Sequence, residues 1–180
     1  MQEYNILTIA NLVPRKRIDL CAAACARMEK KHPLTWTVIG YGPLEEQIKK
    51  NAPKAMTFIG RVEDLVPYYR KADVFVLPSC DEGFGMVYVE AIMCRCPVVC
   101  GKDDGGQEII DRTGGGLAIE IPPSDDRAAD EIIRAIEKIL DNKDSYISAE
   151  IIGKARQLVE PRAIKDIWEK LLGKYEKFLQ

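Results

Sequence analysis

The feature that most constrains the fold of this chain is the alternation of short apolar runs with longer segments of helical periodicity. Strand-like runs are predicted at residues 6–10, 35–39, 56–59, 74–77, 97–100 and 117–119. Helical segments are predicted between them at residues 18–31, 44–51, 65–71, 86–93 and 107–111. Because alternating strands and helices form βαβ units, we expect an α/β fold, a Rossmann-like three-layer αβα sandwich with a mainly parallel sheet.

The segment after residue 123 is predicted to be a C-terminal helical tail. Two prolines end the alternation, and only helical periodicity follows them. The expected boundaries are an N-cap at Ser124 or Asp125, a periodic stretch through Leu140, a second through Gln157 and a third after Glu160-Pro161. No repeat, low-complexity segment or Ser/Gly-rich linker divides the 180 residues, so we predict a single domain over residues 1–180.

Composition restricts the classes of partner. The 26 basic and 28 acidic residues give a formal net charge of −2, which provides no general attraction for nucleic acid or an anionic membrane. Apolar runs such as residues 74–77 are far too short to span a bilayer, and the first five residues lack the pattern of a secretory signal. We therefore expect a soluble, cytoplasmic protein that binds any anion at a local site.

Cysteine and histidine usage argues against two kinds of chemistry. None of the six cysteines has Cys-x-x-Cys spacing, and five lie in or beside apolar segments, which favours buried thiols in a reducing compartment. The single histidine, His32, has no partner for a zinc cluster or a nucleophile–histidine pair. Zinc chemistry and hydrolase triads are therefore not expected.

Ligands of an open parallel sheet bind at the carboxyl ends of its strands, so the loops there are candidate sites. After the first predicted strand, Arg15, Lys16 and Arg17 precede a helix, an arrangement suited to a diphosphate or simply a solvated charge run. After the second, Gly40-Tyr41-Gly42-Pro43 permits close approach of a flat or anionic group, or is only a tight turn. A dinucleotide fingerprint would need glycine at position 45, which is Glu45. Gly60-Arg61-Val62 follows the third strand, as a contact for a base edge or as an ordinary turn.

The loop after the fourth predicted strand is the most informative. Gly83 and Gly85 flank Phe84 and make the turn permissive, and the helix that follows directs its unpaired N–H groups at the loop, which suits a phosphate. Glu82 precedes those amides and Glu90 is expected about two turns into the helix. The two carboxylates are therefore placed to contact different parts of one elongated ligand.

The alternative is that both glutamates are structural. Glu82 would then be a charge favoured by the helix dipole, and Glu90 an ordinary helix former. Against this, apolar residues surround Glu90, where an unpaired carboxylate would be costly. A further glycine pair at residues 105–106 begins the next helix and is expected to close the site from the far side.

These motifs together resemble the C-terminal domain of glycosyltransferase family 4, whose members have the GT-B fold. The series covers essentially the whole chain and consists of Leu12-Val13-Pro14-Arg15-Lys16, Gly40-Tyr41-Gly42-Pro43-Leu44, Phe58-Ile59-Gly60-Arg61-Val62, Ala72-Asp73-Val74-Phe75-Val76-Leu77-Pro78-Ser79, Glu82-Gly83-Phe84-Gly85 with Glu90-Ala91, Pro97-Val98-Val99, Gly105-Gly106 with Glu108-Ile109-Ile110, and Gly116-Leu117 with Pro122-Pro123. Each motif alone is weak, but the ordered series is specific. The chain would then be one half of a GT-B fold.

The resemblance implies a role for each site residue. Glu82 would contact the donor sugar near the reacting carbon, Glu90 the ribose hydroxyls, and Lys16 the leaving diphosphate, so that no metal or other cofactor is implied. The backbone amides at residues 85–87 would hold the distal phosphate, and the turn at residues 61–62 would contact the base. The implied catalytic residues are Glu82 and Lys16, and the implied donor-binding residues are Asn11, Arg15, Lys16, Gly40, Gly42, Arg61, Val62, Glu82, Gly83, Phe84, Gly85, Met86, Val87 and Glu90.

Two positions depart from the family pattern. The family has Gly-Arg where this chain has Ala10-Asn11, and that arginine is the second cation on the diphosphate. Its loss removes a contact of roughly 1.5 to 3 kcal/mol unless Arg15 or Arg17 compensates. The glycine that follows the lysine in the family is Arg17 here.

The function implied is that of the donor-binding domain of a retaining, metal-independent glycosyltransferase that uses a UDP- or GDP-sugar in glycan, glycolipid or polysaccharide synthesis. An N-terminal acceptor domain would be missing, so this chain alone should be inactive, and any membrane contact would be made by the missing domain. The alternatives are a non-catalytic nucleotide-sugar-binding module, a GT-B-fold nucleotide-sugar epimerase and, more distantly, an NAD-dependent enzyme.

Overall fold

The computed structural model describes residues 3–80 and 82–160. Its centre is one six-stranded sheet in the order β3-β2-β1-β4-β5-β6, in which every neighbouring pair is parallel. The strands are β1 (Tyr4–Ile9), β2 (Leu34–Ile39), β3 (Met56–Ile59), β4 (Val74–Leu77), β5 (Val98–Gly101) and β6 (Gly116–Ile119). The predicted parallel sheet is confirmed.

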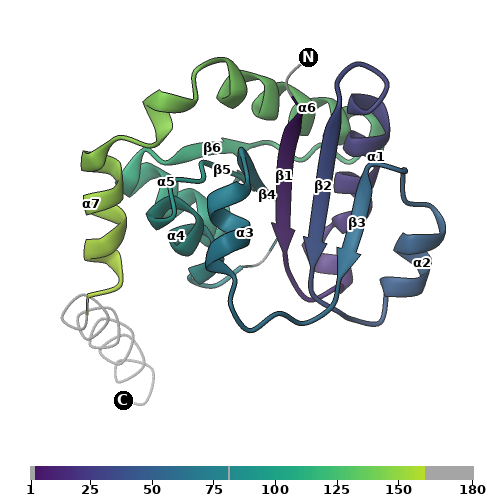
Figure 1. The fold of residues 1–180 in the computed structure, drawn as a ribbon, viewed down its shortest axis with the longest axis horizontal. Coiled ribbons are helices and arrows are strands. Elements are labelled where there is room, and N and C mark those ends of the chain that lie inside the picture. Colours follow the sequence, from purple (N-terminus) through teal and green to yellow (C-terminus); the bar gives the residue numbers. More distant parts are fainter. Residues whose placement is uncertain (1–2, 81, 161–180) are drawn as a thin grey trace, which may run out of the picture.

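Helices cover both faces of this sheet. They are η1 (Pro14–Lys16), α1 (Ile18–Met28), α2 (Glu45–Lys50), α3 (Val66–Lys71), α4 (Met86–Met93), α5 (Gly105–Thr113), α6 (Asp125–Asp141), η2 (Lys143–Tyr146) and α7 (Ala149–Leu158). Helix α1 packs against α6, while α4 and α5 pack against α7 (Figure 1). The molecule is therefore the Rossmann-like sandwich that the alternation predicts, and the described part of the tail is helical.

The central strands read as continuous apolar runs because both of their faces are covered. All four residues of β4 and of β5 are buried. Thr8, a fully buried polar residue of β1, donates to the Val76 carbonyl at 2.7 Å and accepts from the Trp36 indole N–H at 3.0 Å. Its burial therefore leaves no hydrogen-bonding group unpaired.

Most predicted element boundaries differ from the observed ones by one to three residues. The largest difference at a helix start is in α5, which begins at Gly105 rather than at residue 107. The pair was expected to open this helix, but the predicted helical range began only after it. The structure shows why they are helical: the Asp104 side chain caps the helix by accepting from the Gly105 N–H at 2.8 Å. The helix predicted after Pro161 lies outside the described residues.

The strand order reverses at β1, which lies between β2 and β4. At such a switch point the connections from neighbouring strands run to opposite faces and leave a crevice at the carboxyl ends. The loops after β1 and β4 therefore border the position where a ligand is expected. Within the described residues, no helix combines the length and the apolar character needed to cross a membrane.

Candidate functional site

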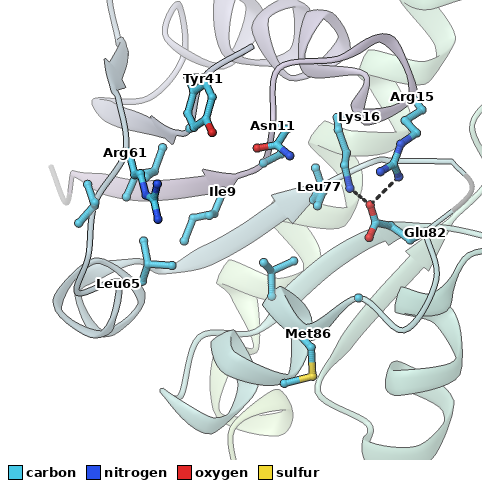
Figure 2. A pocket seen from close by; sticks show the side chains of 16 residues that line it. Ile9, Asn11, Arg15, Lys16, Tyr41, Arg61, Leu65, Leu77, Glu82 and Met86 are labelled. Atoms are coloured by element: carbon cyan, nitrogen blue, oxygen red, sulfur yellow. Dashed lines mark hydrogen bonds and ion pairs between the residues drawn. The ribbon is translucent and has the colours of Figure 1, made fainter. Parts of the chain in front are cut away.

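A cavity of about 430 Å³ lies at this switch point. Loops after four strands form its wall, and the apolar ends of three strands and of α3 form its floor (Figure 2). The wall consists of Ala10, Asn11, Arg15 and Lys16 after β1, Gly40 and Tyr41 after β2, Arg61 and Val62 after β3, and Glu82, Gly85, Met86 and Val87 around the start of α4. The cavity therefore brings together most of the residues that the sequence selects.

Three charged groups meet at one end of the cavity. Arg15 Nη1 lies 3.1 Å from Glu82 Oε1, and the Lys16 ammonium contacts the same carboxylate oxygen. Figure 2 shows these three side chains converging, with Arg61, Tyr41 and Leu65 at the opposite end. The two cations thus point at a single position, which is the arrangement needed to hold an anion.

Lys16 is unusual because it is buried, with 7% of its surface exposed. It belongs to the short helix η1, whose proline at position 14 suits the first turn. Burial, followed by the neighbouring Arg15 charge, lowers the pKa of the Lys16 ammonium, and the Asp104 carboxylate partly opposes this shift. Because burial disfavours the charged form of Lys16, an anion close to the ammonium group would stabilise it.

A buried carboxylate anchors the loop that carries Glu82. Asp104 Oδ1 accepts from the Glu82 N–H at 2.6 Å, and Asp104 Oδ2 accepts from the Ser79 hydroxyl at 2.7 Å. The same side chain caps α5, so one residue ties together the loops that follow β4 and β5. The glycine pair at residues 105–106 was expected to close the site from the far side, but it does not line the cavity; the loop instead supports Glu82 through Asp104.

The start of α4 supplies backbone donors. Gly85 is the N-cap residue with φ of 67°, a conformation that glycine adopts without strain, and a Cβ there would lie 2.6 Å from the Tyr88 ring. No described side chain caps the helix, so its first amides, at Met86 and Val87, have no such partner where they border the cavity. Phosphates bind at helix ends of this kind.

Gly83 and Phe84 do not line this cavity. The Gly83 carbonyl lies so close to Gly105 that a Cβ on Gly105 would be 1.7 Å from it, and Phe84 packs against the core. Their part in the site is to shape the turn between Glu82 and α4.

Glu90 lies on α4 about one turn after the first residue, Met86, and not two turns as expected; the helix itself begins and ends where the sequence predicts. Its carboxylate accepts a hydrogen bond from the Tyr69 hydroxyl at 3.0 Å. The Glu90 carboxylate is therefore not unpaired, because Tyr69 on α3 donates to it. The energetic cost that argued against a structural role for Glu90 does not arise. Glu90 does not itself line the cavity but continues the helix face on which Met86 lies.

The two glycines after β2 allow this loop to lie close to the backbone of the loop after β1. A Cβ at Gly40, whose φ is 137°, would lie 1.9 Å from the Ala10 carbonyl oxygen, and one at Gly42 would lie 2.5 Å from that of Leu12. The Leu12 N–H also donates to the Tyr41 carbonyl at 2.9 Å. Gly40 lines the cavity and Gly42 does not, so Gly42 chiefly allows the first two loops to pack together.

Of the two arginines that were candidates to replace the family's second cation, Arg15 lines the cavity and Arg17 does not. Arg17 instead ends η1 and precedes α1 with φ of 52°, the left-handed conformation for which a glycine is normally used. The position therefore keeps the backbone geometry of a glycine at a cost of about 1–2 kcal/mol. Asn11 lines the cavity beside Lys16 (Figure 2).

Sequence reasoning missed two supporting residues, Tyr69 and Asp104 in its anchoring role. Neither has a local signal: Tyr69 reads as part of an amphipathic helix, and Asp104 reads as an ordinary N-cap. Each acts on a residue at least 20 positions away in the chain, which only the fold brings close.

Cysteine and histidine side chains take no part in a metal cluster among the described residues, where no group of three potential ligands occurs. All six cysteines are free thiols, four of them buried and two, Cys80 and Cys94, half-buried. His32 contacts the ring of Tyr4 and lies 3.9 Å from Glu137.

Comparison with protein families gives one match over most of the chain. The model of a family described as "Glycosyl transferases group 1" matches residues 1–158. Among curated proteins, the chain is similar to a GDP-mannose-dependent alpha-(1-6)-phosphatidylinositol monomannoside mannosyltransferase of Mycobacterium tuberculosis, with 26% identity over 97% of this chain and 47% of the relative. It is also similar to an amylovoran biosynthesis glycosyltransferase of Erwinia amylovora, with 29% identity over 64% of this chain and 32% of that protein.

Solved structures show the same fold. The chain superimposes on a sucrose-phosphate synthase from Thermosynechococcus elongatus with a TM-score of 0.75 and 23% identity, covering 97% of this chain and 46% of that one. An Anabaena protein, HepE, crystallised with UDP-glucose, gives a TM-score of 0.74 and 20% identity, covering 96% of this chain and 49% of that one. The chain spans about half the length of the first curated relatives it matches.

Proposed function

The chain belongs to the glycosyl transferases group 1 family, and on that premise we propose that it is the donor-binding domain of a retaining, metal-independent glycosyltransferase. The donor is a nucleoside-diphosphate sugar carrying UDP or GDP. The observation that carries this proposal is the convergence of Arg15 and Lys16 on one point of a cavity that the uncapped start of α4 also borders.

The diphosphate is assigned to this charged end. Lys16 and Arg15 provide positive charge in a partly desolvated position, and the amides at Met86 and Val87 provide hydrogen-bond donors for the distal phosphate. When the bond between the sugar and the diphosphate breaks, negative charge grows on the departing oxygen. Donors and cations fixed in advance stabilise that charge, which is the role a metal ion has in other transferases.

The shape of the cavity suggests positions for the sugar, the base and the ribose of the donor. The sugar lies next to Glu82, whose loop Asp104 holds by its backbone. The base lies at the opposite end, against the turn of Arg61 and Val62 with Leu65 beneath it. The ribose lies between these two ends, on the side of α4 that carries Glu90.

A second domain is part of the proposal. The chain spans about half of its first relatives, and the acceptor site is assigned to a domain outside these 180 residues. The acceptor belongs to glycan, glycolipid or polysaccharide synthesis: one relative is named as a phosphatidylinositol mannoside mannosyltransferase and another for amylovoran biosynthesis. The isolated chain binds the donor and does not transfer the sugar.

Calorimetric titration with UDP, GDP and ADP in the presence of EDTA tests this proposal. We expect UDP or GDP to bind, with an affinity that added magnesium does not raise. If none of them binds, the donor-binding assignment is wrong. Binding that requires magnesium would leave the assignment of the cavity but contradict metal independence.

A further inference from the structure

Helices α3 and α4 meet the cavity in the same way. Leu65, at the N-cap position of α3, and Met86, the first residue of α4, both line it. One turn further along each helix, on the same face, lie Tyr69 and Glu90. These two side chains meet in the hydrogen bond from Tyr69 to Glu90 Oε2 at 3.0 Å. Glu90 therefore lies next to Met86 and Val87 of the cavity wall, and Tyr69 contacts it from the buried side.

Tyr69 is well suited to hold a carboxylate in place. Its side chain is buried, with 1% exposed, and its ring packs against that of Phe75 with 5.8 Å between centroids. Burial, and then the adjacent Glu90 charge, raise the pKa of the Tyr69 phenol, so the hydroxyl stays protonated and remains a donor at every physiological pH. The donor position is thus fixed by packing and does not change with pH.

The Glu90 carboxylate has two oxygens with different surroundings. Oε2 accepts from Tyr69, and among the described residues no other group donates to this side chain. A carboxylate can accept about four hydrogen bonds, so most of its capacity is left for a ligand. With Oε2 held, rotation of the carboxylate is restricted and Oε1 has a defined direction.

We propose that Tyr69 is a positioning residue that orients the Glu90 carboxylate to accept hydrogen bonds from the two ribose hydroxyls of the donor. This inference rests on the proposed function, because Glu90 binds ribose only if the cavity binds a nucleotide. Its physical basis is preorganisation: a glutamate that is already ordered loses less side-chain entropy when the ligand binds. Tyr69 does not contact the donor and acts only through Glu90.

A purely structural role for Tyr69 is the alternative, in which its hydroxyl simply finds an acceptor in the core. The two roles differ in one readout. A structural role affects all nucleotides alike, whereas a positioning role affects only ligands that carry ribose hydroxyls. The comparison of a nucleotide with its 2′,3′-dideoxy analogue therefore separates them.

The test is calorimetry on wild-type chain and Tyr69→Phe with UDP, GDP and their 2′,3′-dideoxy forms. Phenylalanine keeps the ring that packs on Phe75 and removes only the hydroxyl. For whichever nucleotide binds, we expect the variant to lose about fivefold in affinity for the ribose form, a fraction of the value of a hydrogen bond to a charged group. Affinity for the dideoxy form should stay the same.

Tyr88→Phe is the matched control. It also removes a buried hydroxyl from a ring packed against Phe75, but that hydroxyl donates to the Leu77 carbonyl and does not contact Glu90. It should keep the wild-type ratio between ribose and dideoxy affinities. Thermal unfolding of each variant shows whether it is folded.

A double-mutant cycle with Glu90→Ala completes the test. If Tyr69 acts through Glu90, adding Tyr69→Phe to Glu90→Ala changes the affinity ratio no further. The inference is overturned if Tyr69→Phe weakens both forms equally, if it leaves the ratio unchanged, or if its effect persists without Glu90. A wild-type chain that binds no nucleotide overturns the proposed function and this inference together. Ribose discrimination that is as large in Tyr69→Phe as in the wild-type chain overturns the inference alone.

Discussion

At the scale of single residues, the charges around Glu82 determine what the cavity can bind. Lys16 and Arg15 share one carboxylate oxygen, and Lys16 is buried. A buried ammonium is stable only with an anion close by. The same cluster can therefore hold a phosphate, provided that Glu82 gives up part of its contact with the two cations.

Lys16→Ala should weaken binding of the nucleoside diphosphate and leave binding of the nucleoside nearly unchanged. The expected loss for the diphosphate is roughly ten- to hundredfold, the value of a charge-assisted hydrogen bond. Calorimetry with the diphosphate and the nucleoside measures both. Arg17→Gly is the control: it removes a neighbouring cation that does not line the cavity, at a position whose φ of 52° suits glycine. Equal losses for both ligands in Lys16→Ala would mean that the loop is structural.

Glu82→Gln should increase the affinity for two ligands to different extents. The substitution removes a negative charge from the two cations, so the nucleoside diphosphate should bind about two- to fivefold more tightly. The nucleotide sugar should gain less, because it also loses the Glu82 contact to the sugar. Titration of one variant with both ligands gives the comparison. Weaker binding of the diphosphate itself would show that Glu82 does not compete with phosphate for Lys16 and Arg15.

At the scale of elements, the site is built from loops whose backbones pack against one another. Gly42 packs against the backbone of Leu12 in the loop after β1. Gly105 packs against the backbone of Gly83 in the loop after β4. These contacts explain Gly42, for which the sequence left ligand approach and a tight turn open, and Gly105, which was expected to close the site. Sequence patterns show that a glycine is needed, but not whether a ligand or another part of the backbone occupies the space, because both need a missing Cβ.

Gly42→Ala should destabilise the fold. The new methyl group would lie 2.5 Å from the Leu12 carbonyl oxygen, and a backbone atom cannot move aside cheaply. We expect a loss of about 2 kcal/mol in the free energy of unfolding, within the range for overpacking. Denaturant unfolding measures it. Gly60→Ala is the control, since a Cβ there meets nothing within 4 Å. Equal stability of the two variants would contradict the loop packing described here.

At the scale of the whole molecule, the sheet, its parallel order and the location of the site at the strand ends could all be predicted from sequence, because periodicity and strand-end loops are local signals. The pairing of Tyr69 with Glu90 and of Asp104 with the Glu82 amide could not, because these residues are distant in the chain. The position of Glu90 relative to the cavity also needed the structure: α4 has the predicted bounds, but no local pattern shows that Glu90 is not among the residues that line the cavity.

The central claim is that the donor diphosphate lies between Lys16 and the start of α4. Amide chemical shifts in an NMR titration with UDP or GDP test it most directly. We expect the largest shifts at Gly85, Met86 and Val87, with further shifts in the η1 loop. Largest shifts at the start of α5, around Gly105, or no shifts at all with any nucleotide, would contradict it.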